Sequence, residues 1–213
     1  MLYIYCAGGF GKEVFDIACR SGYNPNEILF IDDSLSTASS PNVVSFHSYV
    51  YSHSVTDEVI IAHGEPSVRY ALYQKLLPFD PNFATIIDPS CIVSNSVKIG
   101  QGVVICPLCS ISSDTTLSDN CVVNTMSIVG HDCIIGDHSV ISSMVNLGGS
   151  VIVQSQVYIG MGALIRESLS LADHCIVSMG AVVHRDVEIR HVVQGDPARS
   201  RMLNESGKIF KRT

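Results

Sequence analysis

Two sets of residues in this sequence have types and spacing suited to chemistry. The first is His131-Asp132, an imidazole next to a carboxylate. The second comprises a glycine-rich turn at 8–12, the pair Asp32-Asp33, and Gly64, each of which closely follows a short apolar segment. Glycines let backbone amides approach a pyrophosphate, and carboxylates accept hydrogen bonds from a ribose or a base edge. The second set indicates a nucleotide site, although glycines that only form tight turns would give a similar pattern.

The segments around the second set predict a small α/β domain. Apolar residues at 3–7, 28–31 and 59–62 read as strands, and apolar residues at helical spacing follow the glycine turn and Pro66. Strands that alternate with helices predict a parallel sheet, which binds ligands beyond the carboxyl ends of its strands. Because this segment is too short for a full NAD domain, we predict a Rossmann-like nucleotide-sugar-binding domain over 1–80. Further expected features are a polar loop at 34–42 and a linker at 79–84.

A six-residue repeat organises the second part of the sequence. Every sixth residue from Ile87 to Ile189 is Ile, Leu or Val, without exception. A second register, four residues later in each repeat, holds mostly smaller side chains. This period fits a parallel β-helix with three faces and three hexapeptides per coil, so we predict six coils. Five of the eight cysteines lie in the smaller register, where we expect them to act as small hydrophobes: Cys91, Cys109, Cys121, Cys133 and Cys175.

The repeat also predicts what surrounds His131. A shift of three hexapeptides places Gly149 one coil above His131 and Gly148 above Gly130, which leaves a notch beside an outward-facing imidazole. In the same way Gly162 stacks under Gly180. Such a bare strip has room for the slender pantetheine arm of coenzyme A, and its glycines allow close backbone contacts.

The combination of a short nucleotide-binding domain with a hexapeptide β-helix resembles the sialic-acid O-acetyltransferase-like family of hexapeptide-repeat acyltransferases. Within it, the pattern is most similar to bacterial N-acetyltransferases that act on UDP-4-amino-sugars. The resemblance rests on AGGFGKEV, FIDDS, the turn at 64–69, IIDPSCIVS, IVGHDCIIGD, YIGMGALI and QGDPAR. It implies an α/β Rossmann-like domain followed by a left-handed parallel β-helix of hexapeptide repeats over 81–213, including a C-terminal tail.

The resemblance also implies an activity. It is acetyl-CoA-dependent N-acetylation of a UDP- or dTDP-linked 4-amino-dideoxy sugar in bacterial surface glycan biosynthesis. No metal is expected. The flat outer faces of a three-faced prism predict a homotrimer with the active site between neighbouring subunits. The alternatives are an O-acetyltransferase acting on a sialic-acid-like sugar and a non-catalytic trimeric scaffold.

Residue roles follow from the same resemblance. His131 is expected to be the general base, and Asp132 to hold and activate the imidazole. The Gly149 amide, which the repeat places one coil above His131, is the candidate oxyanion donor. Two positions depart from many relatives, which have histidines where this chain has Phe10 and Val140. The expected nucleotide-sugar contacts are Gly9, Phe10, Gly11, Asp32, Asp33 and Gly64. The expected acetyl-CoA contacts are Val140, Gly148, Met161, Gly162, Met179 and Gly180.

Composition and residue spacing argue against a nucleic-acid-binding protein, a membrane protein and a zinc-dependent enzyme. The 213 residues include 13 basic and 20 acidic side chains, a net charge of −7, which disfavours a nucleic-acid binder. No apolar run reaches the roughly 18 residues of a membrane span, and the first residues lack a signal-type pattern, so we predict a cytoplasmic protein. Zinc-dependent β-helix enzymes need histidines about five residues apart, whereas Met126 and Gly136 flank His131 at that spacing.

Overall fold

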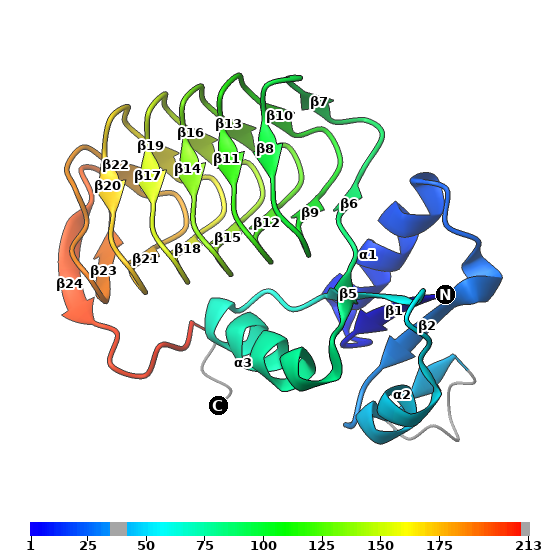
Figure 1. The fold of residues 1–213 in the computed structure, drawn as a ribbon. Helices are drawn as coiled ribbons and strands as arrows, with labels where there is room; N and C mark the ends of the chain where they lie inside the picture. The colour runs from blue at the N-terminus through cyan, green and yellow to red at the C-terminus, as the bar shows by residue number, and fades with distance from the viewer. Residues whose placement is uncertain (35–41, 210–213) are drawn as a thin grey trace.

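The N-terminal part of the chain forms a five-stranded parallel sheet (Figure 1). The computed structural model describes residues 1–34 and 42–209. The strand order is β3-β2-β1-β4-β5, so the central strand β1 pairs with β2 and β4 in parallel. The strands are β1 (Leu2–Tyr5), β2 (Ile28–Ile31), β3 (Val43–Val44), β4 (Glu58–Ile61) and β5 (Asn82–Phe83). This confirms the predicted parallel α/β sheet.

Helices cover both faces of this sheet. On one face, α1 (Gly9–Arg20) buries Val14, Ile17 and Ala18 in a core that continues into the β-helix. On the other face, α2 (Phe46–Ser52) and α3 (Pro66–Leu76) pack against the tyrosines of β1 through residues such as Tyr49. Short 3-10 turns at Pro25–Glu27 and Leu77–Phe79 complete the domain.

Three short elements of this domain differ from the sequence-based expectation. Helix α2 was not predicted; it begins after Ser45, whose Oγ accepts the N–H of Ser48 at 3.0 Å. Strand β3 was not predicted either, and it is a very short strand at the sheet edge. The segment expected to be a linker contributes β5, which pairs with β4. The expected polar loop lies mostly outside the described residues.

The second part of the chain is a three-faced β-helix with three hexapeptides per coil. Each strand pairs with the strand one coil away, for example Ile128 with Asn146. The predicted hexapeptide β-helix is therefore confirmed. At its end, β23 (His191–Gln194) and β24 (Arg199–Leu203) form an antiparallel pair. The short strands of the coils are β6 (Ile86–Ile87), β7 (Ile92–Val93), β8 (Lys98–Ile99), β9 (Val104–Ile105), β10 (Ser110–Ile111), β11 (Thr116–Leu117), β12 (Val122–Val123), β13 (Ile128–Val129), β14 (Ile134–Ile135), β15 (Val140–Ile141), β16 (Asn146–Leu147), β17 (Ile152–Val153), β18 (Tyr158–Ile159), β19 (Leu164–Ile165), β20 (Ser170–Leu171), β21 (Ile176–Val177) and β22 (Val182–Val183).

The prism has three faces, one for each sheet of its coils, and two of its corners carry predicted site residues. The domain face contains β6, β9, β12, β15, β18 and β21, the open face contains β7, β10, β13, β16, β19 and β22, and the third face contains β8, β11, β14, β17 and β20. The His131 corner is the turn at 130–132 and its stacked equivalents, between the open face and the third face. The methionine corner is the turn at 160–162 and its equivalents, between the domain face and the open face.

Both predicted registers line the interior of the β-helix. The larger and the smaller side chains form one core along the coils, with those of the first coil only partly buried: Ile87, Cys91, Val93, Val97 and Ile99. At the other end Ile189 is 55% exposed, where the regular pairing ends with an isolated bridge between Leu171 and Val187. Buried cysteines fill the smaller register as free thiols, and burial raises the pKa of Cys121 and Cys175 to about 12.

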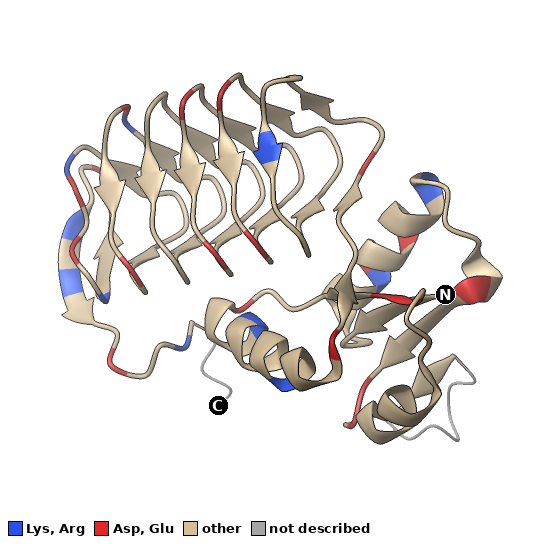
Figure 2. Cartoon of the chain, in the orientation of Figure 1, with Lys and Arg blue, Asp and Glu red and all other residues tan. Residues whose placement is uncertain are grey.

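Charged side chains are distributed unevenly over the fold. Few strands of the β-helix carry one; charges gather in its turns, in α1 and α3, and along β24 (Figure 2). Within residues 1–34 and 42–209, no helix has both the length and the apolar character that a membrane span requires.

Candidate active site

His131 and Asp132 form a hydrogen-bonded pair on an exposed turn. Asp132 adopts a left-handed backbone conformation, with φ 57°, and its Oδ2 lies 2.7 Å from His131 Nδ1. A carboxylate can only accept, so Nδ1 carries the proton that is donated to it. The neutral ring then presents the lone pair of Nε2, and the imidazole remains 65% exposed. The pair thus has the arrangement of a base held in one tautomer.

Gly149 lies one coil above His131, as the repeat predicts. The Ser150 N–H donates to the His131 carbonyl oxygen at 2.7 Å, which fixes the stacking of the two turns. A Cβ atom on Gly149 would lie 2.5 Å from His131 Nε2 and 2.6 Å from Cε1. The imidazole therefore occupies the space that any side chain at position 149 would need.

The Gly149 amide is also uncapped. At the equivalent turn of another corner, aspartate side chains accept the N–H of the residue one coil below. Among the described residues, no hydrogen bond of this kind reaches the Gly149 N–H, which leaves it available next to Nε2 of His131. The capped amides are Gln101 N–H to Asp119 Oδ1 at 2.9 Å, Asp119 N–H to Asp137 Oδ1 at 3.0 Å, and Ser155 N–H to Asp173 Oδ1 at 2.9 Å.

The glycine-rich turn lies at the start of α1, where Asp32 holds it in place. Asp32 Oδ2 accepts the Ala7 N–H at 3.0 Å, and Oδ1 accepts from the Ser34 N–H at 2.9 Å. A Cβ on Gly11 would overlap the Cys6 carbonyl oxygen, so only glycine allows α1 to begin this close to β1. Gly9 has open space around it, as expected of a turn that a ligand could approach.

Asp33 belongs to a cluster that sequence reasoning did not identify. Its Oδ1 accepts the Phe46 N–H at 2.8 Å, and its Oδ2 lies 3.2 Å from Lys75 Nζ. Lys75 also donates to the Tyr5 hydroxyl at 2.8 Å and lies 3.9 Å from the centre of the Phe46 ring. Burial raises the pKa of Tyr5 above its usual value, so the phenol stays neutral. The helix α2 and the lysine of α3 lacked any motif that would have revealed this cluster.

The predicted nucleotide-sugar residues converge at one edge of the sheet. The turns after β1, β2 and β4 carry Gly9–Gly11, the aspartate pair and Gly64, and these strands are adjacent and parallel. Phe10 is half-buried and packs against the core shared with the β-helix. This core involves the domain face, whereas His131 projects from the corner opposite that face. One chain therefore does not bring the predicted acceptor turns and His131 together.

The predicted coenzyme residues occupy more than one place. Gly148 lies at the His131 corner, while Met161, Gly162, Met179 and Gly180 lie at the methionine corner, where both methionines are exposed. The expectation for Val140 is wrong: it is 1% exposed and packs in the core between the domain face and α1. The N-terminal domain covers the domain face at this coil.

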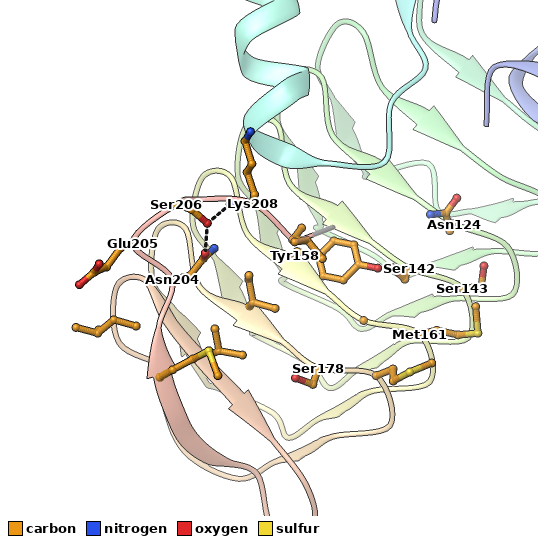
Figure 3. A pocket seen from close by; sticks show the side chains of 17 residues that line it. Asn124, Ser142, Ser143, Tyr158, Met161, Ser178, Asn204, Glu205, Ser206 and Lys208 are labelled. Carbon is orange, nitrogen blue, oxygen red and sulfur yellow. Dashed lines mark hydrogen bonds between the residues drawn. The ribbon is translucent and has the colours of Figure 1, made fainter. Parts of the chain in front are cut away.

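A cavity of about 920 Å³ adjoins the methionine corner (Figure 3). The β-helix supplies one wall, and the segment that follows β24 supplies the other. This segment is tied back to the N-terminal domain, because the Ile209 N–H donates to Glu65 Oε1 at 2.8 Å. Tyr158 opens the YIGMGALI motif, but the other polar residues of the cavity belong to no motif, so the sequence did not reveal them: Asn124, Ser142, Ser143, Ser178, Asn204, Glu205, Ser206 and Lys208.

No group of three or more His, Cys, Asp or Glu side chains in the described part of the chain is arranged to hold a metal ion. The groups that the site itself offers for chemistry are the imidazole, its carboxylate partner and backbone amides.

Comparisons with known proteins agree with this organisation. Residues 1–76 match the family model described as the PglD N-terminal domain. No curated protein matches the chain significantly. Among solved structures, WeeI from Acinetobacter baumannii AYE is 28% identical, with a TM-score of 0.88 over 94% of this chain and 99% of that chain.

Two further structures were solved with ligands. The acetyltransferase domain of PglB from Neisseria gonorrhoeae FA1090, in complex with acetyl coenzyme A, is 28% identical over 94% of this chain and 98% of that chain, with a TM-score of 0.87. PerB from Caulobacter crescentus, in complex with CoA and GDP-perosamine, is 25% identical over 94% and 97%, with a TM-score of 0.88. The comparisons thus support an acetyl-CoA-dependent acyltransferase with a PglD-type N-terminal domain and a hexapeptide β-helix.

Proposed function

We propose that this chain is an acetyl-CoA-dependent N-acetyltransferase that acts on the amino group of a nucleotide-linked 4-amino-dideoxy sugar. We further propose a UDP- or dTDP-linked acceptor and a role in bacterial surface glycan biosynthesis. The observation that carries the proposal is the His131–Asp132 pair beside the uncapped Gly149 amide. It lies in a fold shared over nearly the whole chain with PerB, whose structure holds CoA and a nucleotide-linked amino sugar.

His131 and Gly149 would divide the chemistry between them. As the amine nitrogen attacks the thioester carbonyl carbon, His131 Nε2 takes the proton that the nitrogen loses. The Gly149 N–H donates to the carbonyl oxygen while negative charge develops on it. The carbon–sulfur bond then breaks, and the proton on His131 passes to the departing thiolate. Asp132 keeps Nδ1 protonated throughout, so that Nε2 remains the base.

Two features of the β-helix support an active site between subunits. The acceptor turns and His131 lie on opposite sides of one prism, so a single chain is incomplete. The open face, which joins the His131 corner to the methionine corner, exposes Ile92, Ile128 and Leu164 to solvent in the single chain. Covering them with a neighbouring copy in a C3 trimer would bring the His131 corner of one subunit beside the methionine corner of the next.

The trimer predicts that a charge on the open face abolishes both assembly and activity. Ile128→Asp should produce a monomer and reduce acetyl transfer to background, because the carboxylate would have to be buried without a partner. Light scattering after gel filtration measures the mass. Val55→Asp, at an exposed position in the N-terminal domain, is the control and should remain trimeric. A monomeric wild-type protein with full activity would contradict the shared site.

The carboxyl edge of the sheet predicts a selective loss in acceptor binding. Asp32→Ala removes the acceptor of the Ala7 and Ser34 amides, so the KM for the nucleotide sugar should rise roughly tenfold or more. The KM for acetyl-CoA should stay near the wild-type value. Asp16→Ala on the exposed side of α1 serves as the control. Equal increases for both substrates would show that Asp32 supports the whole fold and not the acceptor site.

Nucleotide binding tests the proposal directly. Titration calorimetry with UDP, dTDP and GDP should show saturable binding of at least one nucleotide, weakened by Asp32→Ala. A free sialic-acid-like acceptor or a scaffold would require no nucleotide site, so the absence of binding to all three would favour those alternatives.

A further inference from the structure

Arg69, in α3, is the largest side chain that the structure buries completely, with 0% exposure. No carboxylate in the described part of the chain forms an ion pair with its guanidinium. Removing a charge from water without an opposite charge is costly unless hydrogen bonds replace the lost hydration. Burial lowers the pKa of Arg69 to about 10, so it remains protonated at neutral pH.

Carbonyl groups from both domains surround this cation. Nη1 donates to the Ile61 oxygen at 2.6 Å and to the His63 oxygen at 3.1 Å, at the end of β4. Nε donates to the Asn120 backbone oxygen at 2.9 Å, and Nη2 donates to Asn120 Oδ1. Asn120 lies in the β-helix turn between β11 and β12. One guanidinium therefore joins the loop that carries Gly64 to a fixed point on the β-helix.

The hydrogen bonds of Arg69 also order a histidine. Because Asn120 Oδ1 accepts from Arg69, its Nδ2 faces His138 Nδ1 at 2.9 Å, which must accept and leave the ring neutral. The ring packs edge-on against Tyr70 and Tyr73 of α3 at 5.3 and 5.0 Å. Burial lowers the pKa of His138, in agreement with the neutral form. The helix α3 is thus fixed to the β-helix by a chain of contacts that starts at Arg69.

On its other side, the loop held by Arg69 reaches the cavity. The loop includes Glu65, which is buried, and Glu65 Oε1 accepts the N–H of Ile209 in the cavity wall. The same loop includes Gly64, one of the expected acceptor contacts. The contacts of Arg69 therefore set the positions of both the acceptor turn and the tail segment that closes the cavity.

We propose that Arg69 is a positioning residue for the acceptor, which it never touches. It holds the 61–65 loop at a fixed place over the β-helix, so that the turn carrying Gly64 keeps the geometry in which it binds the nucleotide sugar. The inference rests on the proposed function, because it requires an acceptor at the carboxyl edge of the sheet.

Two variants test this role in the full-length enzyme. Arg69→Lys keeps the charge but cannot reach all four oxygens, and Asn120→Ala removes the side-chain acceptor while leaving the arginine in place. Each should raise the KM for the nucleotide amino sugar roughly tenfold, with kcat and the KM for acetyl-CoA within about twofold of wild type. Arg69→Met, which also removes the charge, should raise the KM for the nucleotide amino sugar more than Arg69→Lys does.

A second arginine provides the matched control. Arg20 also joins the N-terminal domain to the β-helix, through Asp88 Oδ2 at 2.7 Å, but it lies at the end of α1 remote from the glycine turn. Arg20→Gln should leave both KM values unchanged. Thermal unfolding and acetyl-CoA binding establish that each variant is folded, and Asn120→Ala carries the test if Arg69→Lys does not fold.

The outcomes separate this inference from the function on which it rests. Wild-type activity with unchanged acceptor KM in folded Asn120→Ala and Arg69→Lys would overturn the role of Arg69 alone. Parallel increases in both KM values would overturn it too, since they indicate a general structural effect. A wild-type enzyme that binds and acetylates no nucleotide amino sugar would instead refute the proposed function.

Discussion

His131→Ala should lower kcat by about 10²- to 10⁴-fold while both substrates still bind, because general-base assistance contributes this much in enzymes that rely on it. The imidazole is largely exposed and packs in no core, so its removal should leave the fold intact. Steady-state kinetics measure the loss in kcat, and calorimetry with acetyl-CoA and the nucleotide sugar measures the retained binding.

Two variants accompany this measurement. Asp132→Asn should reduce kcat less than His131→Ala, because the carboxylate fixes the tautomer without handling the transferred proton. His174→Ala removes a histidine from another left-handed turn and should have little effect. If His131→Ala retains near-wild-type kcat, the base has been assigned to the wrong residue.

Gly149→Ala should reduce kcat by about 10²-fold or more, since loss of one oxyanion donor costs about 10²- to 10³-fold. The new methyl group would overlap His131 Nε2 and Cε1, so the imidazole must turn away from its present position. The methyl group also crowds the amide that we expect to bind the oxyanion. Steady-state kinetics with saturating acetyl-CoA measure the change, and thermal unfolding tests the integrity of the coil.

The double variant separates a local from a general effect. If Gly149→Ala acts mainly by displacing the imidazole, it should cost much less in the His131→Ala background than in the wild type. An equal loss in both backgrounds would mean that the clash with His131 is not the cause, and would leave the amide as the dominant contribution.

The β-helix could be predicted well because each coil repeats the same local environment. Every hexapeptide has one large and one small apolar side chain, and few folds other than a β-helix can bury both. Because the β-helix has three faces, each residue stacks on the residue three hexapeptides later. The placement of Gly149 over His131 came from this arithmetic alone. Ile189 shows the limit of this prediction. The repeat still places an apolar residue at this position, although regular strand pairing has already ended.

The N-terminal domain was predictable where a run of apolar residues marks a buried strand or helix face. The turns after β1, β2 and β4 lie where their apolar strands indicated, whereas the short edge strands and the brief helix α2 leave no periodic signal. The Asp33 cluster was missed for this reason, since its partner Phe46 opens α2. The burial of Val140 was missed for a different reason. Val140 occupies an outward position on a β-helix face, which is buried because another domain covers it, and the periodicity of the repeat carries no information about that domain.

The cavity and Arg69 depend on contacts between segments far apart in the chain. The cavity is lined by residues near positions 124 and 206. Arg69 donates a hydrogen bond to Asn120, which lies 51 residues away in the sequence. From the sequence, an arginine in an ordinary helix is expected to be a solvated surface side chain. Arg69 is buried only because α3 packs on the β-helix.

Acetyl transfer to a nucleotide-linked amine is the most direct test of the account. The purified protein would be incubated with acetyl-CoA and UDP-, dTDP- or GDP-linked 4-amino-dideoxy sugars, with product analysis by mass spectrometry and NMR. We predict that at least one sugar gains a single acetyl group in amide linkage on its amino nitrogen, and that His131→Ala removes this product. An ester on a sugar hydroxyl, or no acetylated product from any of these sugars by a protein that binds acetyl-CoA, would contradict the account.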